Sequence, residues 1–407
     1  MSLIRPFAAL RPVAEHAADV VAPPYDVLNS EEARQRAAGK PWSFLHISKA
    51  EIDLPEGTDA YDPAVYAKAA ENMQSMISQG ILMREAVPCY YAYQLVMGEH
   101  VQTGLVAAAS VKDYDSNRIR KHEFTRPAKE DDRVRQIEAL NAQTGPVLLA
   151  YKSQENVDAI LQQVTRSVPL YDLQADDGIG HRLWLIDDQG TIDQLSAAFD
   201  AMPAIYIADG HHRSAAASRV AHSKGGDEQD MSQYFLSVIF PHKQMKIFDY
   251  NRVVTDLNGL TAEAFLDRIG QQFKCKKETA PVRPTQPGEF GMYLDKEWYR
   301  LNIAPELIPD DPVARLDVSV LANSLLEPVL GIADPRTDAR IDFVGGIRGL
   351  EGLEKRVDSG EMKIAFSLHP TSMEDLMAVA DANEVMPPKS TWFEPKLADG
   401  LVSHMLD

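Results

Sequence analysis

The five residues Asp209-Gly210-His211-His212-Arg213 combine residue types that could bind a phosphate group. They follow the apolar run AIYIA, which is typical of a short buried strand, and precede the small-residue segment SAAAS, which favours a helix. Glycine permits a tight turn between the two and a close approach of ligand to backbone. The helix would expose its first N–H groups and the positive end of its dipole, and Arg213 adds a planar charged fork. We therefore expect Gly210, His211, His212 and Arg213 to bind phosphate.

The Asp-Gly-His-His-Arg segment also has structural explanations. Asp209 could simply cap the helix, and the two histidines could make surface hydrogen bonds. A metal site built on His211 and His212 is disfavoured, because adjacent helical residues point about 100° apart. If the segment binds phosphate, the Arg213→Ala substitution is expected to change stability little, because the helix keeps its Ala-rich packing face and its Asp209 cap.

A second polar segment, Arg120-Lys121-His122-Glu123, precedes a predicted helix at 128–142. A carboxylate beside cationic neighbours stays ionised, and a positioned carboxylate can accept the proton of a hydroxyl. Glu123 is therefore a candidate general base, and Arg120 is a candidate for a substrate pocket. The alternative is a solvated charge run, which is the usual role of such segments.

Two other segments could line a substrate pocket. Pro23-Pro24 stiffens the chain and could aim Tyr25 and Asp26 into a cleft, although a packed tyrosine and a capping aspartate explain the same letters. In the polar-aromatic segment KSTWFEPK, an anion could meet Lys389 or Ser390 while Trp392 closes over it. A C-terminal strap that packs down through its aromatic side chains is the alternative.

Periodicity predicts an α+β protein with mixed sheets and not a run of βαβ units. Three regions are expected. Residues 1–84 form an extended and helical segment that packs on the core, and residues 85–255 form the core with the phosphate site. Residues 256–407 form a smaller C-terminal α+β part, whose tail at 387–401 could return to the site.

Charge and cysteine content limit the partners and the compartment. The formal net charge of −19 argues against binding to nucleic acid or an anionic membrane, whose phosphates need a basic face. Two cysteines without a partner motif suit a reducing cytoplasm. The N-terminus MSLIRPFAALRP lacks the unbroken apolar core of a signal peptide, and no apolar window is long enough to span a membrane. A cytoplasmic protein that binds small molecules is predicted, with its oligomeric state left open.

Several motifs carry a resemblance to known families. RPFAALRP, VVAPPYDVL, RKHEFTRPAKEDDR, IADGHHRSAA and MPPKSTWFEPKLADGL resemble DUF1015, a family of uncharacterised bacterial and archaeal proteins. DGHHR after a buried strand is similar to the phosphate-binding box of the ParB/sulfiredoxin superfamily. In particular, the segment is similar to that of the free serine kinases, whose Asp-Gly-His-x-Arg box holds a nucleotide. It implies a ParB/sulfiredoxin-like central core, and the absence of cysteine from the box disfavours sulfiredoxin chemistry.

The free serine kinases also carry a His-Glu pair ahead of their nucleotide box, with the glutamate as the catalytic carboxylate. The resemblance therefore implies catalytic roles for His122, Glu123 and Asp209, with ADP or ATP as the nucleotide. In this interpretation Asp209, or a water near it, holds Mg²⁺. The predicted activity is phosphotransfer to a small hydroxyl metabolite, with free serine the leading candidate. Two alternatives are a phosphatase acting on phosphoserine or a similar phosphometabolite, and a regulatory protein that binds nucleotide without turnover.

Overall fold

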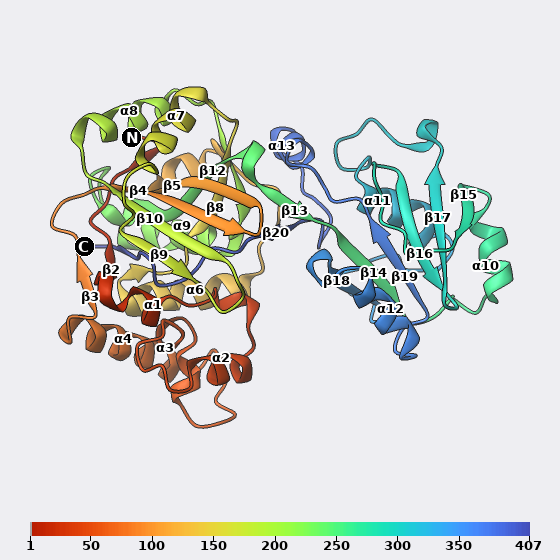
Figure 1. Ribbon diagram of the computed structural model, residues 1–407, viewed down its shortest axis with the longest axis horizontal. Coiled ribbons are helices and arrows are strands. Elements are labelled where there is room, and N and C mark those ends of the chain that lie inside the picture. Colours follow the sequence, from red (N-terminus) through yellow and green to blue (C-terminus); the bar gives the residue numbers. More distant parts are fainter. Residues whose placement is uncertain (1) are drawn as a thin grey trace. The chain divides into compact units, whose positions relative to one another are not determined.

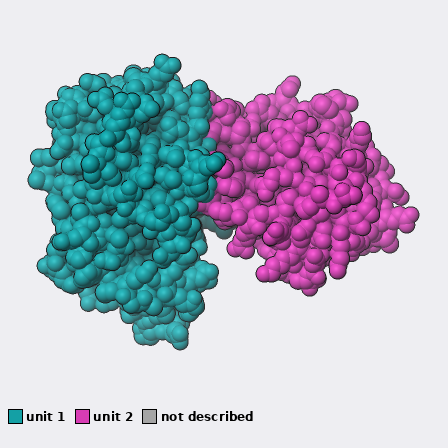
Figure 2. All heavy atoms as spheres, in the orientation of Figure 1, with its two compact units in different colours: residues 1–245, 395–407 teal, residues 246–394 magenta. Residues whose placement is uncertain are grey.

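The computed structural model describes residues 2–407, which form two compact units (Figures 1 and 2). Unit 1 comprises Met1–Met245 and Pro395–Asp407, and unit 2 comprises Lys246–Glu394. The expected boundary at 255/256 therefore differs from the observed division. The reason is strand pairing, because the strands that follow Met245 pair within unit 2.

Unit 1, taken over its described residues, is built on a nine-stranded mixed sheet. Along the sheet the order is β6-β11-β8-β12-β5-β4-β10-β9, and β1 pairs with β5. The pairs β6–β11 and β8–β12 are parallel, and the other pairs are antiparallel. In chain order the strands are β1 (Ile4–Arg5), β4 (Tyr90–Met97), β5 (His100–Ser110), β6 (Ile119–Arg120), β8 (Val147–Tyr151), β9 (Tyr171–Gln174), β10 (Gly180–Ile186), β11 (Ile205–Asp209) and β12 (Tyr234–Pro241).

The helices of unit 1 pack on this sheet and on the N-terminal region. Side chains of α7, α8 and α9 share one core with the sheet, and a second core joins α2, α3 and α4 to the end of α6. The helices are α1 (Ala17–Val20), α2 (Ser30–Ala37), α3 (Leu45–Ser48), α4 (Pro63–Ser78), α5 (Val111–Asp115), α6 (Pro127–Leu140), α7 (Glu155–Val164), α8 (Gln189–Asp200) and α9 (His211–Lys224). Within residues 2–407, no helix combines the length and apolar character needed to cross a membrane.

The C-terminal residues of unit 1 pair with its N-terminal region. Ala22 bridges Asp399, and Leu10 bridges Ser403. Two small sheets add to this region and join β2 (Leu10–Pro12) to β3 (Leu82–Arg84), and β7 (Ala142–Gln143) to β21 (His404–Met405). The tail thus lies beside the segment that contains Tyr25 and Asp26.

Unit 2 is a smaller α+β unit with a six-stranded sheet among the described residues, in the order β15-β17-β16-β19-β14-β18. Its strands are β13 (Lys246–Phe248), β14 (Tyr250–Val254), β15 (Phe273–Glu278), β16 (Glu289–Leu294), β17 (Glu297–Ile303), β18 (Ile341–Gly345), β19 (Ile364–Leu368) and β20 (Trp392–Glu394). Its helices are α10 (Ala262–Ile269), α11 (Asp317–Leu321), α12 (Glu351–Asp358) and α13 (Met373–Asp381). The predicted α+β class with mixed sheets is confirmed for the chain.

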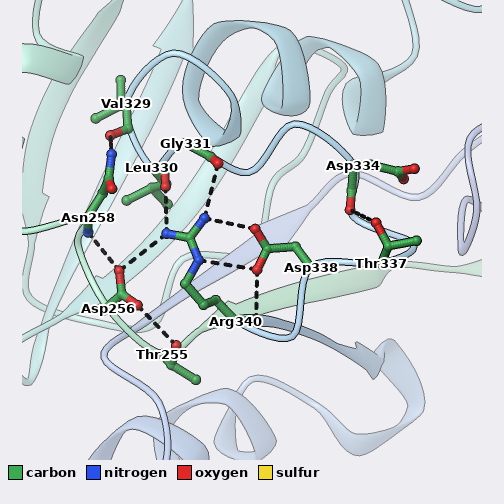
Figure 3. Close-up of polar contacts among 10 residues, drawn as sticks. All are labelled: Thr255, Asp256, Asn258, Val329, Leu330, Gly331, Asp334, Thr337, Asp338 and Arg340. Atoms are coloured by element: carbon green, nitrogen blue, oxygen red, sulfur yellow. Dashed lines mark hydrogen bonds and ion pairs between the residues drawn. The ribbon is translucent and has the colours of Figure 1, made fainter.

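One arginine fixes the irregular segment that precedes β18. Figure 3 shows the Arg340 guanidinium donating to the carbonyl oxygens of Leu330 and Gly331 and pairing with Asp338. The same guanidinium lies 3.5 Å from Asp256, which follows β14. Because these contacts satisfy carbonyl groups outside helices and strands, they stabilise a long loop without secondary structure.

Candidate functional site

The junction between β11 and α9 is a single glycine. Gly210 has φ of 99°, in the left-handed region that favours glycine, and it is the N-cap of α9. A Cβ at this position would lie 3.1 Å from Arg213 Nε. The cap has no side-chain hydrogen bond, so Asp209 does not cap the helix. The first N–H groups of a 14-residue helix therefore remain for a ligand, as phosphate binding requires.

Asp209 is instead held in an ion pair with a residue from the C-terminal tail. Lys396 Nζ lies 3.3 Å from Asp209 Oδ2, and Arg213 Nη2 lies 3.8 Å from Oδ1. Partial burial opposes ionisation of the carboxyl group, but the charges of Lys396 and Arg213 outweigh it and lower the pKa of Asp209. The sequence pattern does not single out Lys396, although this residue ends the tail segment KSTWFEPK.

Strand pairing brings the second polar segment to the start of α9. β6 runs parallel to β11 with Arg120 beside Tyr206, so residues that follow the two strands meet at one edge of the sheet. Glu123 Oε2 lies 3.8 Å from Nδ1 of His211, the first residue of α9. The Glu123 side chain is 55% exposed, so a substrate can reach this carboxylate.

His211 and His212 accept hydrogen bonds from the loop that carries Glu123. The backbone N–H of His122 donates to His211 Nε2 at 3.3 Å, and the backbone N–H of Arg126 donates to His212 Nε2 at 3.1 Å. A ring nitrogen that accepts a hydrogen bond is unprotonated, so each ring is neutral with its proton on Nδ1. Burial lowers the pKa of both His211 and His212, which keeps them in this state. The His211 Nδ1–H therefore faces Glu123.

His122 is fully inside the protein next to His211. Its side chain is 2% exposed, and the two rings meet edge to face at 4.5 Å. Burial lowers the pKa of His122 to about 4, although a hydrogen bond with the Ile207 backbone partly opposes the shift. Among residues 2–407, His122 Nδ1 is one of the few buried side-chain atoms without a hydrogen-bond partner. The ring is thus a neutral imidazole with an unused acceptor.

Arg213 lies beneath the turn and contacts protein groups. Its side chain is 11% exposed, Nη1 donates to the Pro146 carbonyl oxygen, and Nη2 lies 3.8 Å from Asp26 Oδ2. Burial acts to lower the pKa of Arg213, but Asp26 and Asp209 raise it overall, so the guanidinium stays charged. In the structure, the guanidinium group contacts a backbone carbonyl and two carboxylates. A contact between this group and a phosphate remains a prediction.

A pocket lies on the side of Arg213 that faces α6 and β8. Arg133 stacks over the Tyr25 ring with 4.0 Å from Cζ to the ring centroid, and burial raises the pKa of Tyr25 to about 12. Asp399 Oδ2 accepts the Tyr25 N–H at 3.2 Å. The sequence pattern indicates Tyr25 and Asp26 for a substrate pocket, but it does not place Arg133 or Asp399 beside them. The pocket is lined by Tyr25, Ser48, Arg133, Gln136, Thr144 and Arg213, among others.

Because the carboxyl group of Asp399 is buried, we predict that the free energy of unfolding depends on pH. Its side chain is 1% exposed, and burial raises its pKa to about 7 from 3.8. Because the pKa of this carboxyl group is higher in the folded state than in the unfolded state, protonation of Asp399 favours folding. This stabilisation is fully present below the unfolded-state pKa, and it is lost as the pH rises towards about 7. The free energy of unfolding of the wild type, measured relative to Asp399→Asn, should therefore fall between pH 4 and pH 8 by about 4 kcal/mol at most.

Urea unfolding of both proteins across this range gives the measurement. His122, His181 and His404, whose pKa values burial lowers to about 4, act in the opposite direction. They are present in both proteins, so they cancel in the difference. A difference that stays constant with pH would show that Asp399 does not titrate in this window.

The other predicted pocket residues lie elsewhere. Arg120 lies over the ring of Tyr206, with 5.9 Å from Cζ to the centroid. Lys389, Ser390 and Trp392 belong to unit 2, where Lys389 Nζ and the Trp392 ring both contact Tyr250, and the Ser390 hydroxyl donates to a backbone carbonyl. Their role in a substrate pocket stays a prediction.

The fold and site describe a class of α+β proteins in which a strand-glycine-helix turn and a His-Glu loop meet at one edge of a mixed sheet. The chain belongs to DUF1015, a family of proteins of unknown function, whose family model matches residues 4–319. The family assignment predicted from the sequence motifs is confirmed. No curated protein matches the chain in sequence.

Solved structures provide more distant likenesses. A free serine kinase in complex with AMP is 14% identical with a TM-score of 0.36, covering 73% of this chain and 92% of the kinase. SbnI with a C-terminal truncation, from Staphylococcus aureus, is 13% identical with a TM-score of 0.38, covering 72% and 85%. A conserved hypothetical protein from Pyrococcus furiosus is 14% identical with a TM-score of 0.34, covering 73% and 95%. These likenesses assign no activity to the chain.

Proposed function

We propose that this protein is a phosphotransferase that moves a phosphoryl group from ADP or ATP to a small hydroxyl metabolite, with free serine the leading acceptor. The observation that carries the proposal is the distance of 3.8 Å between the exposed carboxylate of Glu123 and His211, the first residue of α9. A carboxylate base thus lies at the end of a helix that favours phosphate. Phosphoryl transfer needs this combination, because its catalysis is largely positioning and charge stabilisation.

The chemical step assigns one task to each group. The acceptor hydroxyl oxygen bonds to the terminal phosphorus of the nucleotide, and the bond from that phosphorus to the bridging oxygen breaks. The bond electrons leave with the shortened nucleotide, while Glu123 takes the hydroxyl proton. The α9 N–H groups, Lys396 and Arg213 would offset the phosphate charge. Lys396 and Arg213 provide local positive charge in a chain whose net charge is −19.

Asp209 fits a role in holding Mg²⁺. Its carboxylate is ionised, its side chain is 37% exposed, and carboxylate oxygens are the ligands that Mg²⁺ prefers. Bound there, Mg²⁺ would neutralise phosphate charge. The histidine of the predicted catalytic His-Glu pair, His122, is buried and would act by orienting the loop of Glu123.

Incubation of the folded protein with serine, Mg²⁺ and either ADP or ATP should produce phosphoserine, which ³¹P NMR detects directly. The expected products are phosphoserine and AMP or ADP in equal amounts. Release of phosphate from phosphoserine without nucleotide would instead indicate a phosphatase that uses water as the acceptor. Nucleotide binding without turnover on any hydroxyl acceptor would contradict the proposal and indicate a regulatory protein.

A further inference from the structure

Three side chains at the start of α9 form a group with the composition of a metal site. One ligand atom from each of His122, Glu123 and His211 lies within 4.8 Å of the other two. Two imidazoles and one carboxylate match the protein ligands of known zinc sites, which leave a fourth position for water. The group uses the proposed catalytic carboxylate but does not involve Asp209, the residue expected to hold Mg²⁺.

We propose that His122, Glu123 and His211 bind a divalent transition-metal ion of the zinc type. The strongest support is His122, a member of this group whose buried Nδ1 is an acceptor without a hydrogen-bond partner. An unused acceptor inside a protein is unfavourable by about 1–3 kcal/mol, and a metal ion would satisfy it. The hydrogen bond between His122 and the Ile207 backbone leaves Nδ1 as the free nitrogen of the ring.

The second coordination shell also fits a metal ligand. A metal-bound histidine usually donates its other ring N–H to a carbonyl or carboxylate, which fixes its orientation and tautomer. His122 has such a partner in Ile207, and burial keeps the ring neutral, as a ligand must be. His122 is thus oriented as a ligand before any ion arrives.

The remaining two ligands need a small adjustment. Ligand atoms in a tetrahedral zinc site are about 3.4 Å apart, given metal–ligand distances of about 2.1 Å. The His211–Glu123 distance of 3.8 Å exceeds this slightly, and Glu123 is exposed on a loop that can close the difference. Binding through His211 Nδ1 would move the ring proton to Nε2 and break the long 3.3 Å hydrogen bond that the His122 backbone N–H donates to Nε2.

The ligand set selects among metal ions. Imidazole nitrogen suits Zn²⁺, Cu²⁺, Ni²⁺ and Fe²⁺, whereas Mg²⁺ prefers oxygen ligands in an octahedron. The site should therefore bind Zn²⁺ and Co²⁺ in preference to Mg²⁺. A carboxylate bound to a metal ion is a poor base, so, if Glu123 acts as proposed above, zinc at this site would inhibit the transfer.

Competition against a chromophoric chelator tests the site in the full chain without nucleotide or serine. Chelator-treated wild-type protein should take up one tightly bound Zn²⁺, and Co²⁺ should give the visible absorption of a four-coordinate complex. Glu123→Gln should weaken zinc binding by at least about 100-fold, because even outer-shell changes weaken metal sites by 10–100-fold. Its matched control is Glu138→Gln, which changes an exposed carboxylate on α6 outside the group.

The comparison of the two variants decides the outcome, because surface pairs such as His46–Asp53 and His222–Asp115 can also hold zinc weakly. Equal zinc affinity in wild type, Glu123→Gln and Glu138→Gln would overturn the proposal. His211→Asn gives a second test where it folds, with the loss of the Co²⁺ spectrum as the expected result. The metal-binding assay contains no phosphoryl donor, so its result does not depend on whether the protein is a phosphotransferase.

Discussion

Glu123→Gln is expected to lower kcat for phosphoryl transfer by about 10²–10⁴-fold, the range that a positioned general base contributes. Gln keeps the size of the side chain but does not accept the hydroxyl proton at neutral pH. The KM for nucleotide should change little, because the phosphates would bind to the α9 N–H groups and not to Glu123. Steady-state rates of phosphoserine formation, with nucleotide affinity measured separately, give both values.

Stability serves as the first control for this substitution. The Glu123 side chain is 55% exposed, and substitutions at exposed positions usually change the free energy of unfolding by less than about 0.5 kcal/mol. Glu138→Gln should leave both kcat and stability unchanged. If Glu123→Gln keeps the full wild-type kcat, another group takes the proton, and the mechanism proposed above is wrong.

The turn at Gly210 could be predicted from sequence because its causes are local. An apolar run, a glycine and a small-residue segment specify strand, turn and helix within a few residues, and the structure has β11 and α9 at these positions. The sequence also predicts a helix at 128–142, and α6 runs over Pro127–Leu140. In both cases neighbouring residues determine the backbone, and hydrophobic periodicity reports it directly.

The partners of the site come from distant parts of the chain, where sequence patterns carry little information. Lys396 reaches Asp209 across 187 residues, and Asp399 reaches Tyr25 across 374. A single ion pair has no periodic signature, so only the strand pairing and the return of the tail reveal it. The roles of His211 and His212 as acceptors likewise depend on β6 lying beside β11, a pairing between segments far apart in sequence.

Arg213→Ala is expected to lower the free energy of unfolding by about 2–4 kcal/mol. This loss is smaller than that expected when one partner of a fully buried ion pair is removed, because the partners Asp26 and Asp209 are partly exposed. The sequence alone predicted little change, on the assumption of an Asp209 cap and a guanidinium free for ligand. In the structure, the N-cap of α9 is Gly210 and has no side-chain hydrogen bond, so Asp209 does not cap the helix. The Arg213 guanidinium is not free either, because it contacts the Pro146 carbonyl and two carboxylates. Urea unfolding at pH 8 measures the loss.

The buried carboxyl of Asp399 makes this loss dependent on pH. Burial raises the pKa of Asp399, and the charge of Arg213 opposes this more strongly than that of Arg133, so removal of Arg213 takes away the larger of the two opposing charges. The loss in Arg213→Ala should therefore be larger at pH 8, where Asp399 is ionised, than at pH 5, where it is protonated. Adding Asp399→Asn should recover part of the stability at pH 8, and Arg213→Lys should lose less than Arg213→Ala because it keeps the charge without the fork. A loss that is the same at both pH values and unaffected by Asp399→Asn would mean that Arg213 stabilises the fold through packing, with its charge playing no part.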